Sequence, residues 1–115
     1  MKKTILLFLS LSIFFIAQAQ VSKTINVAAA GTLSTLLTAD EKTTVTNLIV
    51  TGEIDARDFV TMRDAMTVLA VLDLSAASIK QYIGSAGTDP FSFFTYPANE
   101  MPWYSFYNPI TDAGN

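Results

Sequence analysis

The chain has 115 residues, of which seven are basic and ten are acidic, and it contains neither cysteine nor histidine. Without cysteine no disulfide can stabilise the fold. The absence of both residue types also removes the commonest general base, the thiol nucleophile and the usual transition-metal ligands. The acidic balance, without a basic cluster, argues against nucleic acid and anionic membranes as partners.

The first 19 residues have the pattern of a secretory signal peptide. Met1–Lys3 gives a positive start, and the run Ile5–Ile16 is uncharged and mostly apolar. Ala17 and Ala19 place small residues at the two positions that signal peptidase reads, so cleavage is expected before Gln20. The apolar run is shorter than the roughly 20 residues that span a bilayer. We therefore expect a secreted or cell-surface protein with no membrane span after cleavage.

Residues 20–44 predict an N-terminal cap. Val21–Val27 alternates weakly between apolar and polar residues, which favours a short edge strand. Thr38–Glu41 has a capping-box pattern and should open a helical turn through Thr44. Between these segments, spacings of three and four put three leucines on one face of a short helix: Leu33, Leu36 and Leu37.

Residues 45–79 predict a strand, a helix and a second strand. Val45–Val50 is rich in β-branched residues, which favour strands. Asp55 is a good N-cap for a helix over Ala56–Met66 with one apolar face. Val71–Leu74 then forms the second strand, because parallel strands joined by a helix need a crossover of this length.

The apolar residues of these two strands recur 24 positions apart. The matched pairs are Val45 and Leu69, Leu48 and Leu72, and Val50 and Leu74. Leu69–Ile79 fits the leucine-rich-repeat pattern L-x-x-L-x-L-x-x-N-x-L, with Ala77 in place of Asn, and repeats of this kind are about 20–29 residues long. We therefore predict an α/β fold, the start of a leucine-rich-repeat solenoid, with a helical cap and one to two strand–helix units.

Residues 80–115 lack a complete repeat. Tyr82–Asp89 is expected to be a loop, and residues 108–115 have no helix or strand pattern. We expect an aromatic-rich loop and the beginning of a next repeat, with the chain truncated in mid-repeat. Eight aromatic residues lie in this region: Phe91, Phe93, Phe94, Tyr96, Trp103, Tyr104, Phe106 and Tyr107.

Several stretches resemble the N-terminal region of the secreted BspA-like leucine-rich-repeat proteins of Bacteroidetes. They are Ala30–Leu37, Val50–Phe59, Leu69–Ser75, and Tyr96–Pro102 followed by Tyr104–Asn108. The last two are similar to the family's element I-P-x-x-A-F-Y-N, with Met101 for Ile and Ser105 for Ala. The resemblance implies the capping region of an adhesin-like or interaction scaffold, which packs on downstream repeats absent from this chain. It brings no catalytic residues and no cofactor.

Catalytic and metal-binding interpretations find little support in the residues. Asp55 and Asp58 suit the first turn of a helix, Asp64 and Asp73 are expected to face solvent, and no EF-hand spacing is present. No serine lies in a G-x-S-x-G motif. Serine–lysine dyads stay formally open through Lys23, Lys42 or Lys80. We predict a non-enzymatic protein with no catalytic, cofactor-binding or metal-binding residues.

Two interpretations of the aromatic residues remain open. In the first, large rings fill the core, with Phe106 inside and Phe93 and Tyr96 covering its side. In the second, the cluster at 91–107 makes the chain a carbohydrate- or protein-binding module, with Trp103 and Tyr104 as candidate ligand contacts. The predicted structural core consists of Leu33, Leu36, Leu37, Leu48, Val50, Phe59, Leu69, Leu72, Leu74 and Phe106.

Overall fold

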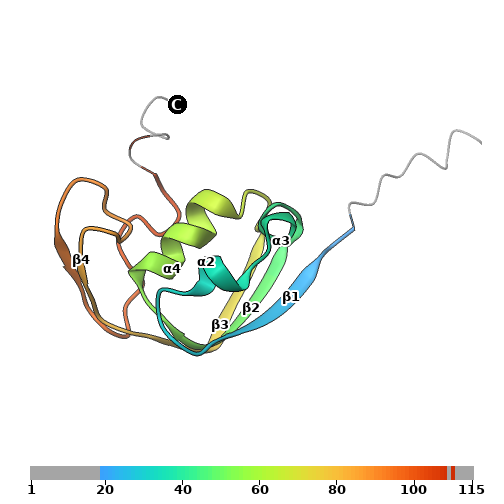
Figure 1. Cartoon of the computed structure of the whole chain (residues 1–115), viewed down its shortest axis with the longest axis horizontal. Coiled ribbons are helices and arrows are strands. Elements are labelled where there is room, and N and C mark those ends of the chain that lie inside the picture. The colour runs from blue at the N-terminus through green and yellow to red at the C-terminus, as the bar shows by residue number, and fades with distance from the viewer. Residues whose placement is uncertain (1–18, 109, 111–115) are drawn as a thin grey trace, which may run out of the picture.

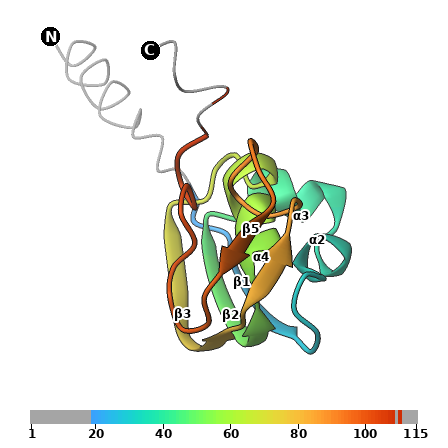
Figure 2. The same ribbon diagram turned by 90° about the vertical axis from the view of Figure 1, so that its left-hand side faces the viewer.

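A computed structural model of the chain describes residues 19–108 and 110. Its central feature is a parallel sheet of three strands in the order β1–β2–β3, and the helices lie together on one face of it (Figure 1). A second, antiparallel sheet pairs β4 with β5 (Figure 2). The elements are β1 (Ser22–Val27), α2 (Leu33–Leu36), α3 (Ala39–Thr44), β2 (Asn47–Ile54), α4 (Ala56–Val60), the π-helical segment η1 (Thr61–Ala65), β3 (Val71–Ile79), β4 (Tyr82–Gly84) and β5 (Phe94–Tyr96).

The spacing of 24 residues in the sequence is the register between β2 and β3. Leu48 lies beside Leu72, while farther along the offset becomes 25, with Thr51 beside Ala76. An irregularity between Ile49 and Thr51 accounts for the extra residue. The predicted parallel strands are therefore present, and both extend farther than the apolar pattern indicated because Gly52 and the small residues after Leu74 also pair.

The crossover helix begins at the predicted cap but changes its geometry after one turn. Asp55 is the N-cap, and its carboxylate accepts a hydrogen bond from the backbone N–H of Arg57 at 2.9 Å. From Thr61 the helix is π-helical, and the N–H of Met66 donates to the carbonyl of Thr61 at 3.2 Å. This wider turn still directs Met62 and Met66 into the core, where both are buried.

The core lies between the parallel sheet and the helices. Of the predicted core residues, Leu33, Leu37, Leu48, Val50 and Phe59 are buried, and Leu69, Leu72 and Leu74 are partly buried against them. Leu36 and Phe106 were also predicted to be in the core, but 44% of Leu36 and 55% of Phe106 are exposed.

The exposure of Leu36 and Phe106 has a local explanation in each case. Helix α2 has only four residues, and Leu37 is already extended, with φ −96° and ψ 134°. Because the chain leaves the helix there, Leu37 turns inward and the helical spacing no longer brings Leu36 to the sheet. Phe106 meets Phe59 edge to face, with 6.4 Å between ring centroids, at the border of the core.

The prediction of a solenoid is wrong. The described residues form a small compact α/β unit in which no fourth parallel strand follows β3. Instead β4 and β5 pair with each other, and residues 97–108 return along β3 (Figure 2) with one backbone hydrogen bond, from the N–H of Asn99 to the carbonyl of Ile79. Pro97 and Pro102 in this segment carry no N–H and cannot support a regular strand ladder.

Gly52 allows β1 and β2 to approach closely at the carboxyl end of β1. Its φ is +89°, and a Cβ at this position would collide with the carbonyl group of Val27 on the neighbouring strand. A side chain would therefore be excluded both by the left-handed backbone and by the space available.

No helix among the described residues is long and apolar enough to cross a membrane.

Candidate interaction surface

The two outer sides of the parallel sheet are covered to different extents. On the β1 side the inward-facing residues Ile25 and Val27 are 8% and 0% exposed. Helix α2 packs against β1, and Lys23 of β1 makes a salt bridge to Glu41 of α3 at 3.1 Å. On the β3 side the corresponding apolar residues remain partly exposed. The core is thus closed at β1 and only partly covered at β3.

A hollow of about 450 Å³ opens beside the first half of β3. The π-helical turn contributes Met62 to its wall, the sheet side contributes Leu69 and Leu72, and the returning C-terminal segment contributes Phe106. Thus the hollow is the part of the core that residues 97–108 do not fill, and polar groups of Arg63 and Thr67 line it beside these apolar side chains.

The backbone of β3 presents unpaired polar groups along the same side. The N–H of Val71 donates to the carbonyl of Thr46 at 3.0 Å, so this residue bonds toward the interior of the sheet. Because successive residues of a strand alternate, Leu72 and Leu74 direct their N–H and carbonyl groups outward. Within residues 19–108 and 110 no strand pairs with this edge, and such an edge can accept another strand.

Asp58 holds the closed side of the molecule together. One carboxylate oxygen accepts from the N–H of Gly31 at 2.7 Å and of Asp55 at 2.9 Å, and the other from the N–H of Leu33 at 2.9 Å. Only 1% of Asp58 is exposed. Since all three donors are backbone groups, the carboxylate has a structural role.

Arg57 connects this cap to the antiparallel sheet. Its guanidinium bonds to the Asp55 carboxylate, with 2.6 Å between Nη2 and Oδ2, and to the carbonyl of Ala30 at 3.1 Å. Its Cζ also lies 4.7 Å from the centre of the Tyr82 ring in β4, a cation–π contact. The hydrogen bond that Arg57 donates to the Asp55 carboxylate raises the pKa of Arg57 above its ordinary value.

Arg63 fixes the aromatic segment to the helix, a role that its position in the sequence did not reveal. Its Nη1 donates to the carbonyls of Thr88 at 2.8 Å and Tyr104 at 2.9 Å. Its Nε and Nη2 bond to the two carboxylate oxygens of Asp64 at 2.8 and 2.9 Å. These bonds lower the pKa of Asp64 below its ordinary value, against a smaller opposing effect of burial.

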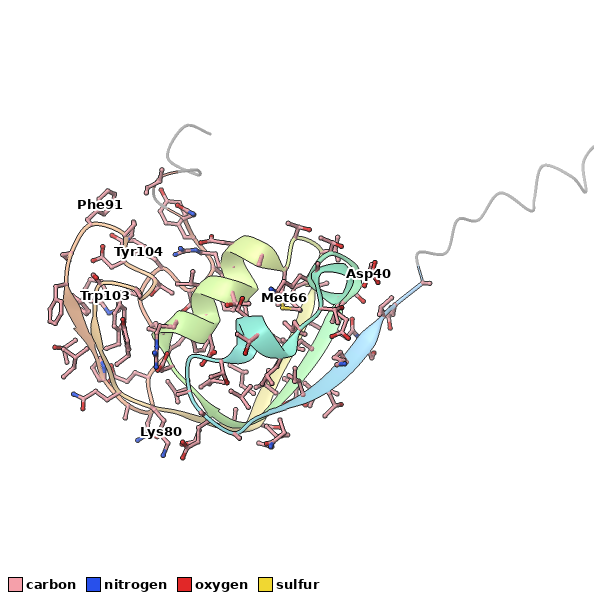
Figure 3. The ribbon with its side chains drawn as sticks, viewed as in Figure 1. Asp40, Met66, Lys80, Phe91, Trp103 and Tyr104 are labelled. Atoms are coloured by element: carbon pink, nitrogen blue, oxygen red, sulfur yellow. The ribbon has the colours of Figure 1, made fainter. Side chains whose placement is uncertain are left out.

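The aromatic residues divide into a packed group and an exposed group. Tyr96 is 2% exposed and contacts Tyr82 and Phe94 with ring centroids 5.9 and 5.1 Å apart. Trp103 is 68% exposed and Tyr104 is 36% exposed. Figure 3 shows both on the lobe that carries β4, with Phe91 near the tip of the lobe. Phe93, predicted to cover the core, is 71% exposed.

The predicted cleavage site lies at the start of the described residues. Ala19 and Gln20 are exposed, and Ala17 lies outside the described residues. Asp73 is exposed, and a hydrogen bond from the Ser75 hydroxyl lowers its pKa. In the part of the chain that the structure describes, no three acidic side chains are grouped as a metal ion would require.

Comparisons with protein-family models and with curated proteins give no match.

Proposed function

We propose that the chain is an exported, non-enzymatic capping region of an adhesin-like or interaction scaffold, of the BspA-like kind that its sequence resembles. The role does not require the predicted solenoid. The observation that carries the proposal is the unequal covering of the sheet, with Val27 at 0% exposure on one side and Leu72 partly exposed on the other. A cap needs one sealed end and one end that can receive another chain segment.

The partner that fits β3 is an extended polypeptide strand. The outward N–H and carbonyl groups of Leu72 and Leu74 offer main-chain hydrogen bonds, and strand addition to a sheet edge gains affinity mainly from such bonds. The hollow that Leu72 lines gives room for a side chain of the partner. Affinity would therefore come from the backbone and selectivity from the side chain that enters the hollow.

The probe is a labelled peptide with the sequence of β3, Val71–Ile79. This sequence already forms a parallel strand of the sheet, where it pairs with β2. We expect saturable binding, measured by fluorescence anisotropy. Replacing Leu74 of the protein by lysine, with the peptide left unchanged, should weaken binding at least about tenfold. The reason is that one lost apolar contact is worth about 1.5 kcal/mol or more.

The matched control is Asp73→Asn, which changes the next side chain on the opposite face of the same strand. An amide can still accept the hydrogen bond that the N–H of Ser75 donates to Asp73 at 2.9 Å, so this variant should bind like the parent. If the parent shows no saturable binding, or if both variants bind equally well, strand addition at β3 is wrong.

A second candidate function is a carbohydrate-binding module, favoured by the exposure of Trp103, at 68%. Exposed aromatic faces can stack on ligands. Trp103 is the single tryptophan of the chain, so its fluorescence reports binding directly. The capping role predicts no change of this fluorescence when oligosaccharides are titrated. A saturable change would favour the carbohydrate-binding function, provided that the Trp103→Ala variant shows no binding by tyrosine fluorescence or calorimetry.

A further inference from the structure

Residues 100–108, which we call the strap, lie along the side of β3 at which strand addition is proposed (Figure 2). Just before the strap, the N–H of Asn99 donates to the carbonyl of Ile79 at the end of β3. Farther along, the Phe106 side chain of the strap lines the same hollow as Leu72. A strand that pairs with Leu72 and places a side chain in the hollow would therefore compete with the strap for space.

The strap buries little apolar surface. Its large side chains Met101, Trp103 and Phe106 are each more than half exposed. The residues that it buries are small, namely Pro102 and Ser105. Segments with few buried apolar contacts open at a low cost in free energy, so apolar packing contributes little to holding the strap in place.

Hydrogen bonds from η1 and from the loop between β4 and β5 hold the strap. Nη1 of Arg63 donates to the carbonyls of Tyr104 at 2.9 Å and Tyr107 at 3.5 Å. The Thr88 hydroxyl donates to the carbonyl of Trp103. The Arg63 side chain is only 8% exposed and Thr88 is fully buried, so both donors are shielded from water. Arg63 and Thr88 therefore attach the strap to the rest of the molecule.

The closed strap contains a strained residue. Tyr104 has a φ of +59°, a left-handed conformation that a bulky side chain adopts only at a cost in free energy. Its carbonyl is one of the groups to which Arg63 donates. The bond to Arg63 therefore keeps the strap in a conformation that it would leave once released.

We propose that the strap is an autoinhibitory segment, which occupies the β3 side in the free protein and is displaced when a partner strand adds to β3. This inference rests on the proposed function, because it concerns the regulation of the same edge. A closed strap lowers the apparent affinity for the partner, since only molecules with an open strap bind. Changes that loosen the strap should therefore tighten binding, whereas a merely structural role predicts no gain in affinity.

The test compares the affinity of the labelled Val71–Ile79 peptide for the full chain and for two variants, Thr88→Val and Arg63→Met. Each variant removes donors to carbonyls of the strap and keeps a side chain of similar size. Because one hydrogen bond changes an equilibrium by about fivefold, Thr88→Val should bind the peptide up to about fivefold more tightly, and Arg63→Met at least as tightly as Thr88→Val. If circular dichroism shows that Arg63→Met does not fold, Thr88→Val decides the test.

Trp103 gives a second measurement, because it belongs to the strap and the peptide contains no aromatic residue. Saturation of the parent with unlabelled peptide should change the fluorescence of Trp103 as the strap is displaced. The matched control is Thr43→Val, which removes a hydroxyl that donates to the carbonyl of Asp40 in α3 at 3.1 Å, outside the strap and its attachments. This variant should bind the peptide like the parent.

The other outcomes separate the strap from the proposed function. If the parent binds the peptide and Thr88→Val binds it equally or more weakly, the strap is overturned and strand addition stands. Unchanged Trp103 fluorescence at saturation also overturns the strap alone. If neither the parent nor either variant shows saturable binding, strand addition and the strap are overturned together.

Discussion

Asp58 and Arg63 are single residues of one helix whose polar atoms bind backbone groups distant in the sequence. Asp58 reaches Gly31 and Leu33, and Arg63 reaches Thr88 and Tyr104. Buried charges of this kind are stable only when each polar atom is paired. Such residues should therefore be sensitive to changes that preserve shape and alter only hydrogen bonding.

Replacing Asp58 by asparagine should destabilise the protein by about 3 kcal/mol. The carboxylate accepts three backbone N–H groups, and an amide would turn one of its acceptor atoms into a donor that faces other donors. Urea unfolding followed by circular dichroism measures the change. Asp40→Asn, at the exposed start of α3, is the control and should stay within about 0.5 kcal/mol of the parent.

Lowering the pH should loosen the aromatic segment through Asp64. Because the pKa of Asp64 in the folded protein lies below its ordinary value of 3.8, its contribution is complete above that value and is lost as the pH falls through the lower folded pKa. The fluorescence of Trp103, whose neighbour Tyr104 is bonded to Arg63, should change in that range. Asp64→Asn should show a smaller acid-dependent change; an equal change would argue against this role of Asp64.

At the scale of elements, the central strand and the edge strand should differ in their contribution to stability. Leu48 in β2 is fully buried, whereas Leu72 beside it in β3 is partly buried. Leu48→Ala should therefore cost about 3 kcal/mol, as is usual for a buried leucine. Leu72→Ala should cost about 1 kcal/mol, because less apolar surface is returned to water. Equal losses in urea unfolding would mean that the β3 side is covered as well as the β1 side.

A methyl group at Gly52 tests the close packing of β1 on β2. Gly52→Ala should destabilise the protein by about 2 kcal/mol, since φ is +89° and the new Cβ would meet the carbonyl of Val27. Thermal unfolding measures the effect. A loss at Gly52 of less than about 0.5 kcal/mol would contradict the close packing of β1 on β2.

The elements up to β3 were largely predictable, and those after it were not. Asp55 and the apolar spacing around Leu48 and Leu72 are local signals that the structure follows. The leucine pattern of α2 was followed only in part, because the helix ends before Leu37 and Leu36 is exposed. The pairing of Tyr82 with Tyr96 has no such signal, because a loop of nine residues separates β4 from β5. The candidate surface was equally hidden, since Phe106 and the long contacts of Arg63 depend on where residues 97–108 return.

At the scale of the whole molecule, the protein combines a sealed β1 side, a partly open β3 side and an exposed aromatic lobe. The parallel sheet and its helices carry the core, while residues 97–108 run along β3 and cover part of that side (Figure 2). The hollow beside β3 and the outward backbone groups of Leu72 and Leu74 lie where this cover is incomplete. The proposed capping role depends on this difference between the two sides.

Amide hydrogen exchange of β3, measured by NMR with and without the Val71–Ile79 peptide, tests this claim most directly. In the free protein the amides of Leu72 and Leu74 should exchange much faster than that of Val71, which is bonded to Thr46, and saturating peptide should slow both. Equal protection of Leu72, Leu74 and Val71 in the free protein, or no slowing by the peptide, would contradict an open β3 edge that receives a strand.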